Sequence, residues 1–199
     1  MSRPDNSGLA KPWPGSAADE TQFRDVIRHL ASGVTVVTSS LGGEPVGLTA
    51  TAVCSVSATP PSLLVSLTAN TRTAQGVVET DAFAVHLLPF RARGIAEQFA
   101  SSRSHFEAVH YSVISEKRIP LLTDVVGWLL CHVKEKFWVE DHLVFVGRVV
   151  GCELKDTAPD PLLYLDRNYR RLLPGAERGA ENLEPWGSSQ DVGLPGFGW

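Results

Sequence analysis

The sequence predicts a mainly β protein, an antiparallel β-barrel with a few short helices, from three observations. Several strand-like segments are β-branched on both faces, and short local links allow hairpins between them. Helices are too few to alternate with strands, as a doubly wound parallel sheet requires. GxGxxG and GxxxxGK are absent, so any nucleotide site must be built another way. The six strand-like segments are 34–39, 45–56, 62–67, 83–88, 128–139 and 143–154.

Helix signals precede and interrupt these strands. Asp19 and Gln22 have the spacing of a helix cap with a reciprocal side chain, and Gly33 is expected to close that helix. The Gly-Gly pair at 42–43 predicts a hairpin whose second arm, 45–56, is long. Two shorter helices are expected over 73–80 and 92–100. The first helix carries its apolar residues at helical spacing, at Phe23, Val26, Ile27, Leu30 and Ala31.

Length and composition favour one soluble domain. With 199 residues, of which 43% are hydrophobic, the chain can bury one substantial core. We expect the domain to span 19–172, between Gly- and Pro-rich tails at 1–18 and 173–199. The second tail carries Trp186, Phe197 and Trp199, so parts of it are expected to dock on the body or on a partner subunit.

Charge and apolar patterning exclude two classes of partner. Lys and Arg number 18 against 22 Asp and Glu, and a net charge of -4 offers no surface for nucleic acid. No apolar run approaches the roughly 20 residues of a membrane helix, so a cytoplasmic protein is expected. Cys54, Cys131 and Cys152 have no metal-site spacing, and buried reduced thiols are the expectation.

The segment 47–57 consists mostly of small and hydroxylic residues. The flat isoalloxazine ring of a flavin has polar atoms along one edge, and it needs backbone N–H groups that no bulky side chain covers. Residues such as Thr49, Ala50 and Ser55 meet that need. The alternative is a Thr- and Ser-rich edge strand whose hydroxyls are solvated.

The segment Ser66–Thr73 ends a strand and begins a helix. Free N–H groups and the helix dipole favour an anion at such a helix start, and Arg72 can add charge to a phosphate site. Ordinary helix capping by Thr71 or Thr73 is the alternative.

A third candidate lies at Glu140-Asp141-His142, where a hairpin must turn between two strand-like segments. The functional hypothesis places His142 over the flavin pocket, in contact with a nicotinamide, while Asp141 shapes the turn and orients the imidazole. The alternative is a solvated loop histidine.

Together these motifs resemble the short-chain flavin reductases, the reductase components of two-component flavin monooxygenases, which adopt the FMN-binding split barrel. The resemblance runs from about residue 23 to 172, with the family's order and spacing. One departure is Glu140, where the family commonly has Gly. The matching stretches are FRDVIRHLASGVTVVTS, PVGLTATAVCSVSATPPSLLVSL, FAVHLLPFRARGIAEQFA, Asp141-His142 with VGRVV after it, and PLLYLDRNYRRL.

The resemblance implies site residues around one flavin. In the family, the loop histidine and a tyrosine near the C-terminal end approach the nicotinamide, and these match His142 and Tyr169. The implied flavin-binding residues are Leu48, Thr49, Ala50, Thr51, Ala52, Ser55, Val56 and Ser57 at the isoalloxazine and ribityl chain, Ser66, Leu67, Arg72 and Thr73 near the phosphate, and Phe99 in the pocket.

We therefore expect an NAD(P)H:flavin oxidoreductase that reduces FAD or FMN and passes reduced flavin to a partner monooxygenase. NADH is favoured over NADPH, because no cluster of Arg and Lys stands out for a 2′-phosphate. A homodimer is expected, since a split barrel leaves strand edges exposed, the chain has five Trp, and a flavin is too large for this barrel to enclose alone. The alternatives are a non-catalytic flavin-binding dimer and an oxidase of the pyridoxamine-phosphate type.

Overall fold

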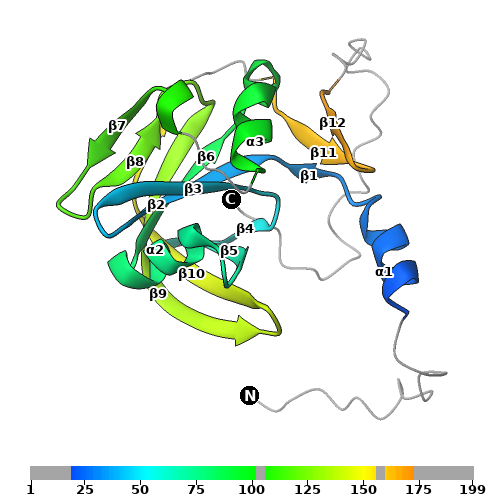
Figure 1. Ribbon diagram of the computed structural model, residues 1–199, viewed down its shortest axis with the longest axis horizontal. Helices are drawn as coiled ribbons and strands as arrows, with labels where there is room; N and C mark the ends of the chain where they lie inside the picture. Colours follow the sequence, from blue (N-terminus) through cyan, green and yellow to red (C-terminus); the bar gives the residue numbers. More distant parts are fainter. Residues whose placement is uncertain (1–18, 102–105, 156–159, 173–199) are drawn as a thin grey trace, which may run out of the picture.

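The protein is described by a computed structural model that covers residues 19–101, 106–155 and 160–172 (Figure 1). The predicted tails, with Trp186, Phe197 and Trp199, lie outside the described residues. The helices are α1 (Glu20–Ile27), α2 (Arg72–Thr80) and α3 (Arg93–Phe99), with single 3-10 turns at Phe90–Ala92 and Phe106–Ala108. The strands are β1 (Ser32–Gly33), β2 (Thr35–Leu41), β3 (Glu44–Ala50), β4 (Val53–Ala58), β5 (Pro61–Thr68), β6 (Ala82–Leu87), β7 (Tyr111–Ile114), β8 (Ile119–Leu122), β9 (Gly127–Val139), β10 (His142–Leu154), β11 (Leu163–Leu165) and β12 (Asn168–Arg170).

The main sheet has seven strands in the order β3-β2-β6-β9-β10-β5-β4, and every neighbouring pair is antiparallel. β3 and β4 therefore lie at opposite edges of the sheet, although only Thr51 and Ala52 separate them in sequence. Two linking residues span at most about 10 Å, so the sheet must roll until its two edges approach each other. The prediction of a mainly β, antiparallel split barrel is confirmed.

The predicted long arm over 45–56 is wrong, because it is two strands. β3 pairs with β2, whereas β4 pairs with β5, and the chain changes partner at Thr51–Ala52. The backbone N–H of Ser66 donates to the Ala52 carbonyl at 3.0 Å and so fixes the break against β5. Periodicity could not locate this change, since Thr and Ala continue the strand-like composition through it.

The sequence patterns did not predict three short strand pairings. The hairpin of β7 and β8 and the small sheet β1-β11-β12 carry only a few residues per strand. Strands this short show too little alternation to be recognised, and their pairing partners supply the stability.

The core fills both sides of the central strands. Val36 and Val37 of β2 and Ala84 and Val85 of β6 are fully buried, so these strands have packing on both faces. α2 covers one face closely, because Gly76 brings its backbone against β2, and a Cβ there would lie 2.7 Å from the Ser40 carbonyl oxygen. α3 covers the other side with Ala96 and Phe99.

The expectation for the cysteines is correct only for Cys131, whose burial raises its pKa to about 12. Cys54 and Cys152 are exposed, because their apolar neighbours in sequence lie on strands with an outward face. All three are free thiols. No helix in the described part of the chain is long and apolar enough to cross a membrane.

α1 begins as predicted, since the Asp19 side chain accepts a hydrogen bond from the Gln22 N–H at 3.1 Å. It ends at Ile27 rather than at Gly33, because Gly33 belongs to β1 and pairs with Leu163. None of the residues of α1 is buried, and Figure 1 shows the helix apart from the sheet.

Candidate active site

A groove of about 330 Å³ lies where the two edges of the rolled sheet approach each other. It combines the end of β3, the link to β4, the end of β5, the cap of α2, the end of α3 and the start of β10. Its lining residues are Leu48, Thr49, Ala50, Thr51, Ala52, Ser66, Leu67, Thr68, Thr71, Phe99, Ala100 and His142.

Side-chain hydroxyls hold the backbone of this groove in place. Thr35 donates to the Ala50 carbonyl at 2.7 Å, and Thr49 donates to the Ala96 carbonyl of α3, also at 2.7 Å. Thr51 and Ala52 are exposed, so small side chains and backbone form an open wall. Such a wall admits a flat ring close to the main chain.

The start of α2 forms the second part of the site. Thr71 caps the helix, because its Oγ1 accepts from the Ala74 N–H at 3.2 Å and donates to the Thr68 carbonyl at 2.8 Å. No described residue accepts from the backbone N–H groups of Arg72 and Thr73, or from the exposed Arg72 guanidinium. Capping by Thr71 thus leaves donors and positive charge for an anion.

His142 is held at the mouth of the groove by two neighbours. Its Nδ1 lies 2.7 Å from Asp141 Oδ1, and its Nε2 lies 3.4 Å from Thr68 Oγ1. The hydrogen bond to His142 lowers the pKa of the Asp141 carboxyl, which therefore remains an acceptor at neutral pH. A carboxylate at Nδ1 selects the tautomer with its proton there, and the ring is 43% exposed, so one face is free for a ligand.

A smaller cavity of about 190 Å³ adjoins the groove, because Thr49, Thr51 and Ala100 line both. Tyr164 and Tyr169 form its aromatic side, with ring centroids 5.4 Å apart. The Arg93 guanidinium lies over the Tyr169 ring at 5.4 Å, and partial burial raises the pKa of the Tyr169 hydroxyl. β11 and β12 carry these rings to the groove, so the two cavities form one continuous surface.

The structure brings together most of the residues that the sequence singled out. Asp141 contacts His142, and Arg72 follows the groove residue Thr71 directly. Two groups lie elsewhere. Thr73 is buried at 2% exposure, so only its backbone faces the helix start. Ser55, Val56 and Ser57 lie on the edge strand β4 and do not line this groove.

Sequence reasoning missed Thr68, Thr71 and Ala100 as lining residues, and Tyr164 beside Tyr169. Thr68 could have been recognised from strand pairing, because the antiparallel register of β5 and β10 places it opposite His142. No sequence pattern indicated Tyr164 or Ala100, because β11 is too short to recognise and α3 reaches the groove only through packing.

No cluster of metal-ligating side chains occurs among the residues that the structure describes.

Comparison with known proteins identifies the family. The flavin reductase like domain matches residues 27–173. The chain is 36% identical to a flavin reductase (NADH) of Kitasatospora aureofaciens over 162 residues, which are 79% of this chain and 84% of that protein. It is 32% identical to the reductase component of 4-hydroxyphenylacetate 3-monooxygenase of Thermus thermophilus, over 76% of this chain and 95% of the other.

A solved structure supports the same assignment. The NADH:FAD oxidoreductase of Streptomyces globisporus C-1027, in complex with NAD and FAD fragments, superposes with a TM-score of 0.74. Sequence identity is 31%, over 80% of this chain and 96% of that one. The fold and its open groove thus define a split-barrel flavoenzyme, and the chain belongs to the flavin reductase-like domain family. The predicted family and enzyme class are confirmed.

Proposed function

We propose that this protein is an NADH-dependent flavin reductase that supplies reduced flavin to a monooxygenase component. The observation that carries the proposal is the groove itself. One continuous surface offers an open wall of small residues, a helix start with the exposed Arg72, and an oriented His142. Relatives named as NADH-dependent reductases and as reductase components of monooxygenases support this activity.

The reaction needs positioning more than acid–base chemistry. Hydride transfer between a nicotinamide and a flavin is chemistry that these two molecules supply when both are bound. The protein has to hold the two rings in register and exclude water from the contact. In this proposal the wall from Leu48 to Ala52 supports the flavin ring.

Other parts of the groove bind the flavin phosphate and the nicotinamide nucleotide. The N–H groups of Arg72 and Thr73 and the Arg72 guanidinium hold the flavin phosphate. His142, fixed by Asp141 and Thr68, orients the nicotinamide from the opposite side of the groove. Tyr169 and Tyr164 extend the apolar surface on which the nicotinamide nucleotide lies.

The proposed active form is a homodimer. β3 and β4 are open edges of the main sheet, and α1 carries exposed apolar residues that no described element covers. A second subunit would cover these surfaces and complete the flavin site. Ser55, Val56 and Ser57, on the open strand β4, would reach a flavin through that assembly.

Anaerobic titration with NADH and NADPH, in the presence of FAD or FMN, tests the proposed function. The expected result is bleaching of flavin absorbance that is faster with NADH, and steady-state NADH oxidation that rises with added free flavin. Flavin binding without reduction would instead indicate a carrier. Coupling to a monooxygenase component, across a dialysis membrane that only small molecules pass, tests delivery by diffusion.

A further inference from the structure

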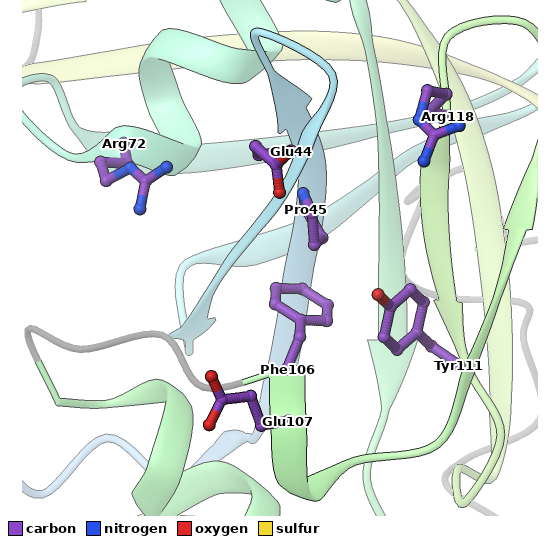
Figure 2. Close-up of a pocket in the computed structure, with 7 residues that line it drawn as sticks. All are labelled: Glu44, Pro45, Arg72, Phe106, Glu107, Tyr111 and Arg118. Atoms are coloured by element: carbon purple, nitrogen blue, oxygen red, sulfur yellow. The ribbon is translucent and has the colours of Figure 1, made fainter.

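A third cavity, of about 440 Å³, lies beyond the start of α2 (Figure 2). Arg72 borders it on one side and Arg118 on the other, with Pro45 and the Phe106 ring between them in this view. Tyr111 adds a second ring, and Glu44 and Glu107 complete the lining. Apart from Arg72, none of its lining residues has a part in the function proposed above.

The cavity borders the flavin groove at three points, although no residue lines both. Thr71 lines the groove and Arg72, the next residue, lines the cavity. β3 runs from the cavity at Pro45 to the groove at Leu48. Phe99 of the groove packs edge to face on Phe106 of the cavity, with centroids 5.1 Å apart. A ligand bound at the start of α2 can therefore extend into either space.

Gly47 makes this junction possible. It lies on β3 between the cavity and the groove, and a Cβ there would approach the Phe99 ring to 2.8 Å and the Phe106 ring to 3.3 Å. Without that side chain the two rings pack directly on the strand, where they form a common floor.

The chemistry of the cavity suits a nucleotide. Phe106 is buried and Tyr111 is 36% exposed, and their rings pack edge to face at 5.1 Å, so together they present an aromatic surface for a base. Nε of Arg118 donates to the Gly43 carbonyl at 3.2 Å, which leaves its terminal amino groups without an acceptor among the described residues. The side chains of Arg72, Glu44 and Glu107 make no hydrogen bond or ion pair with any described residue. Cations for phosphate and carboxylates for ribose or amino groups thus line the space without partners among the described residues.

We infer that this cavity binds the adenosine phosphate half of FAD, which makes FAD the preferred flavin of this protein. The inference rests on the proposed function, because it needs the flavin phosphate at Arg72. FMN ends at that phosphate, whereas FAD continues from it with a second phosphate, a ribose and an adenine. Arg118 would meet the second phosphate, and Tyr111 with Phe106 would support the adenine. NADH carries the same adenosine phosphate, but the junction at Arg72 connects the cavity to the flavin.

The test compares FAD with FMN in Arg118→Gln and Tyr111→Leu. Arg118→Gln should raise the Kd and KM for FAD about tenfold, the scale of one charge-assisted hydrogen bond, while the values for FMN change less than about twofold. Tyr111→Leu, which retains apolar packing on Phe106, should act in the same direction. Tyr111→Phe, which keeps the ring, and Lys117→Gln, which removes a neighbouring charge outside the cavity, are the matched controls.

The outcomes distinguish a failure of the FAD inference from a failure of the proposed function. Equal affinity of the native protein for FAD and FMN, or equal losses for both in Arg118→Gln, would overturn the inference and leave the reductase activity intact. A raised KM for NADH in Arg118→Gln with FMN as the flavin would assign the cavity to the nicotinamide nucleotide and also overturn it. Failure to reduce either flavin would contradict the proposed function instead. Circular dichroism and FMN turnover of each variant establish that it is folded.

Discussion

His142 has the contacts of a positioning residue. Asp141 fixes one ring nitrogen and Thr68 lies beside the other, so the imidazole is oriented before any ligand arrives. His142→Ala should raise the KM for NADH or slow flavin reduction by about ten- to a hundredfold, the cost of losing one oriented contact. Flavin affinity should change little. Stopped-flow reduction at several pH values measures both parameters.

His110→Ala is the matched control, because His110 is exposed and lines neither the groove nor the cavity beside it. Asp141→Asn should reproduce part of the KM effect if orientation is the role of His142. A reduction rate in His142→Ala that loses a pH dependence seen in the native protein would indicate proton transfer rather than positioning. Native rates with native NADH affinity would reduce His142 to a solvated loop residue.

The Arg72 side chain, at the start of α2, has no ion-pair or hydrogen-bond partner in the part of the chain that the structure describes. Arg72→Ala should weaken the binding of FAD and FMN by about 1–3 kcal/mol, because a charge-assisted hydrogen bond to phosphate is lost. Riboflavin has no phosphate, so its affinity should not change in this variant. Isothermal titration with the three flavins measures the difference, and Arg148→Ala, at an exposed position on β10, is the control. Equal losses for riboflavin would mean that Arg72 supports the groove rather than the phosphate.

The backbone conformation at Glu140 favours the Gly that the family commonly has at this position of the hairpin turn. Its φ of 49° lies in the left-handed region, where Gly is unstrained and other residues are not. Glu140→Gly should therefore stabilise the protein by about 0.5–1 kcal/mol, or roughly 1–4 °C in Tm, after the greater flexibility of Gly in the unfolded chain is subtracted. Thermal unfolding measures this.

The contrasting variant is Glu135→Gly in the same hairpin, where φ is not positive and Gly should destabilise the strand. A lower Tm in Glu140→Gly would show that the Glu140 side chain contributes more than its backbone strain costs.

At the scale of elements, α1 has an apolar face that contacts within one subunit do not explain. Phe23, Val26 and Ile27 are exposed at 58%, 74% and 45%, although they form the apolar face of a capped helix. In the proposed dimer this face is covered, so Val26→Asp should weaken association about ten- to a hundredfold, from the lost burial of one aliphatic side chain. Analytical ultracentrifugation over a range of concentrations measures the dissociation constant.

Thr21→Asp places the same charge on the opposite face of α1 and should leave association unchanged. Sedimentation as a monomer with full flavin reduction would contradict the dimer proposal. A stable dimer in Val26→Asp would place the interface elsewhere, such as on the open strand β4.

At the scale of the whole molecule, the buried His86 joins the main sheet to the β7–β8 hairpin. Its Nδ1 lies 3.0 Å from the Val36 carbonyl, and its Nε2 accepts from the Leu122 N–H at 3.1 Å. The ring can serve both partners only when it is neutral. Burial lowers its pKa to about 4, since a charged imidazole cannot be solvated there.

Stability should therefore fall in acid. Below about pH 6.5 the unfolded chain takes up a proton at this position while the folded protein does not, down to about pH 4. The free energy of unfolding should decrease by roughly 3 kcal/mol across that window and be fully retained above it. Urea unfolding at several pH values measures the slope. His86→Asn should be less stable at pH 7 with a flatter slope, whereas His110→Gln should keep the native slope.

The sequence determined the class of fold and most of the chemistry. Alternating β-branched segments predicted the long strands, because burial of one or both faces sets the residue at each position. Hydroxylic and small residues at 47–57 marked the groove wall over 48–52, although Ser55, Val56 and Ser57 lie outside it. Arg72 and His142 stood out as chemistry at element ends. The cap at Asp19 was readable because it depends on residues three positions apart.

Tertiary structure alone decided what depends on distant partners. The break at Thr51–Ala52 follows from the roll of the sheet, since β3 and β4 pair with strands far apart in sequence. Tyr164 reaches the groove through β11, and Arg118 reaches Arg72's cavity through the β7–β8 hairpin. Exposure of Cys54 was likewise set by the edge position of β4, where successive residues are exposed on both faces. Local patterns record the preferences of each segment, whereas pairing and packing between segments fix where the side chains meet.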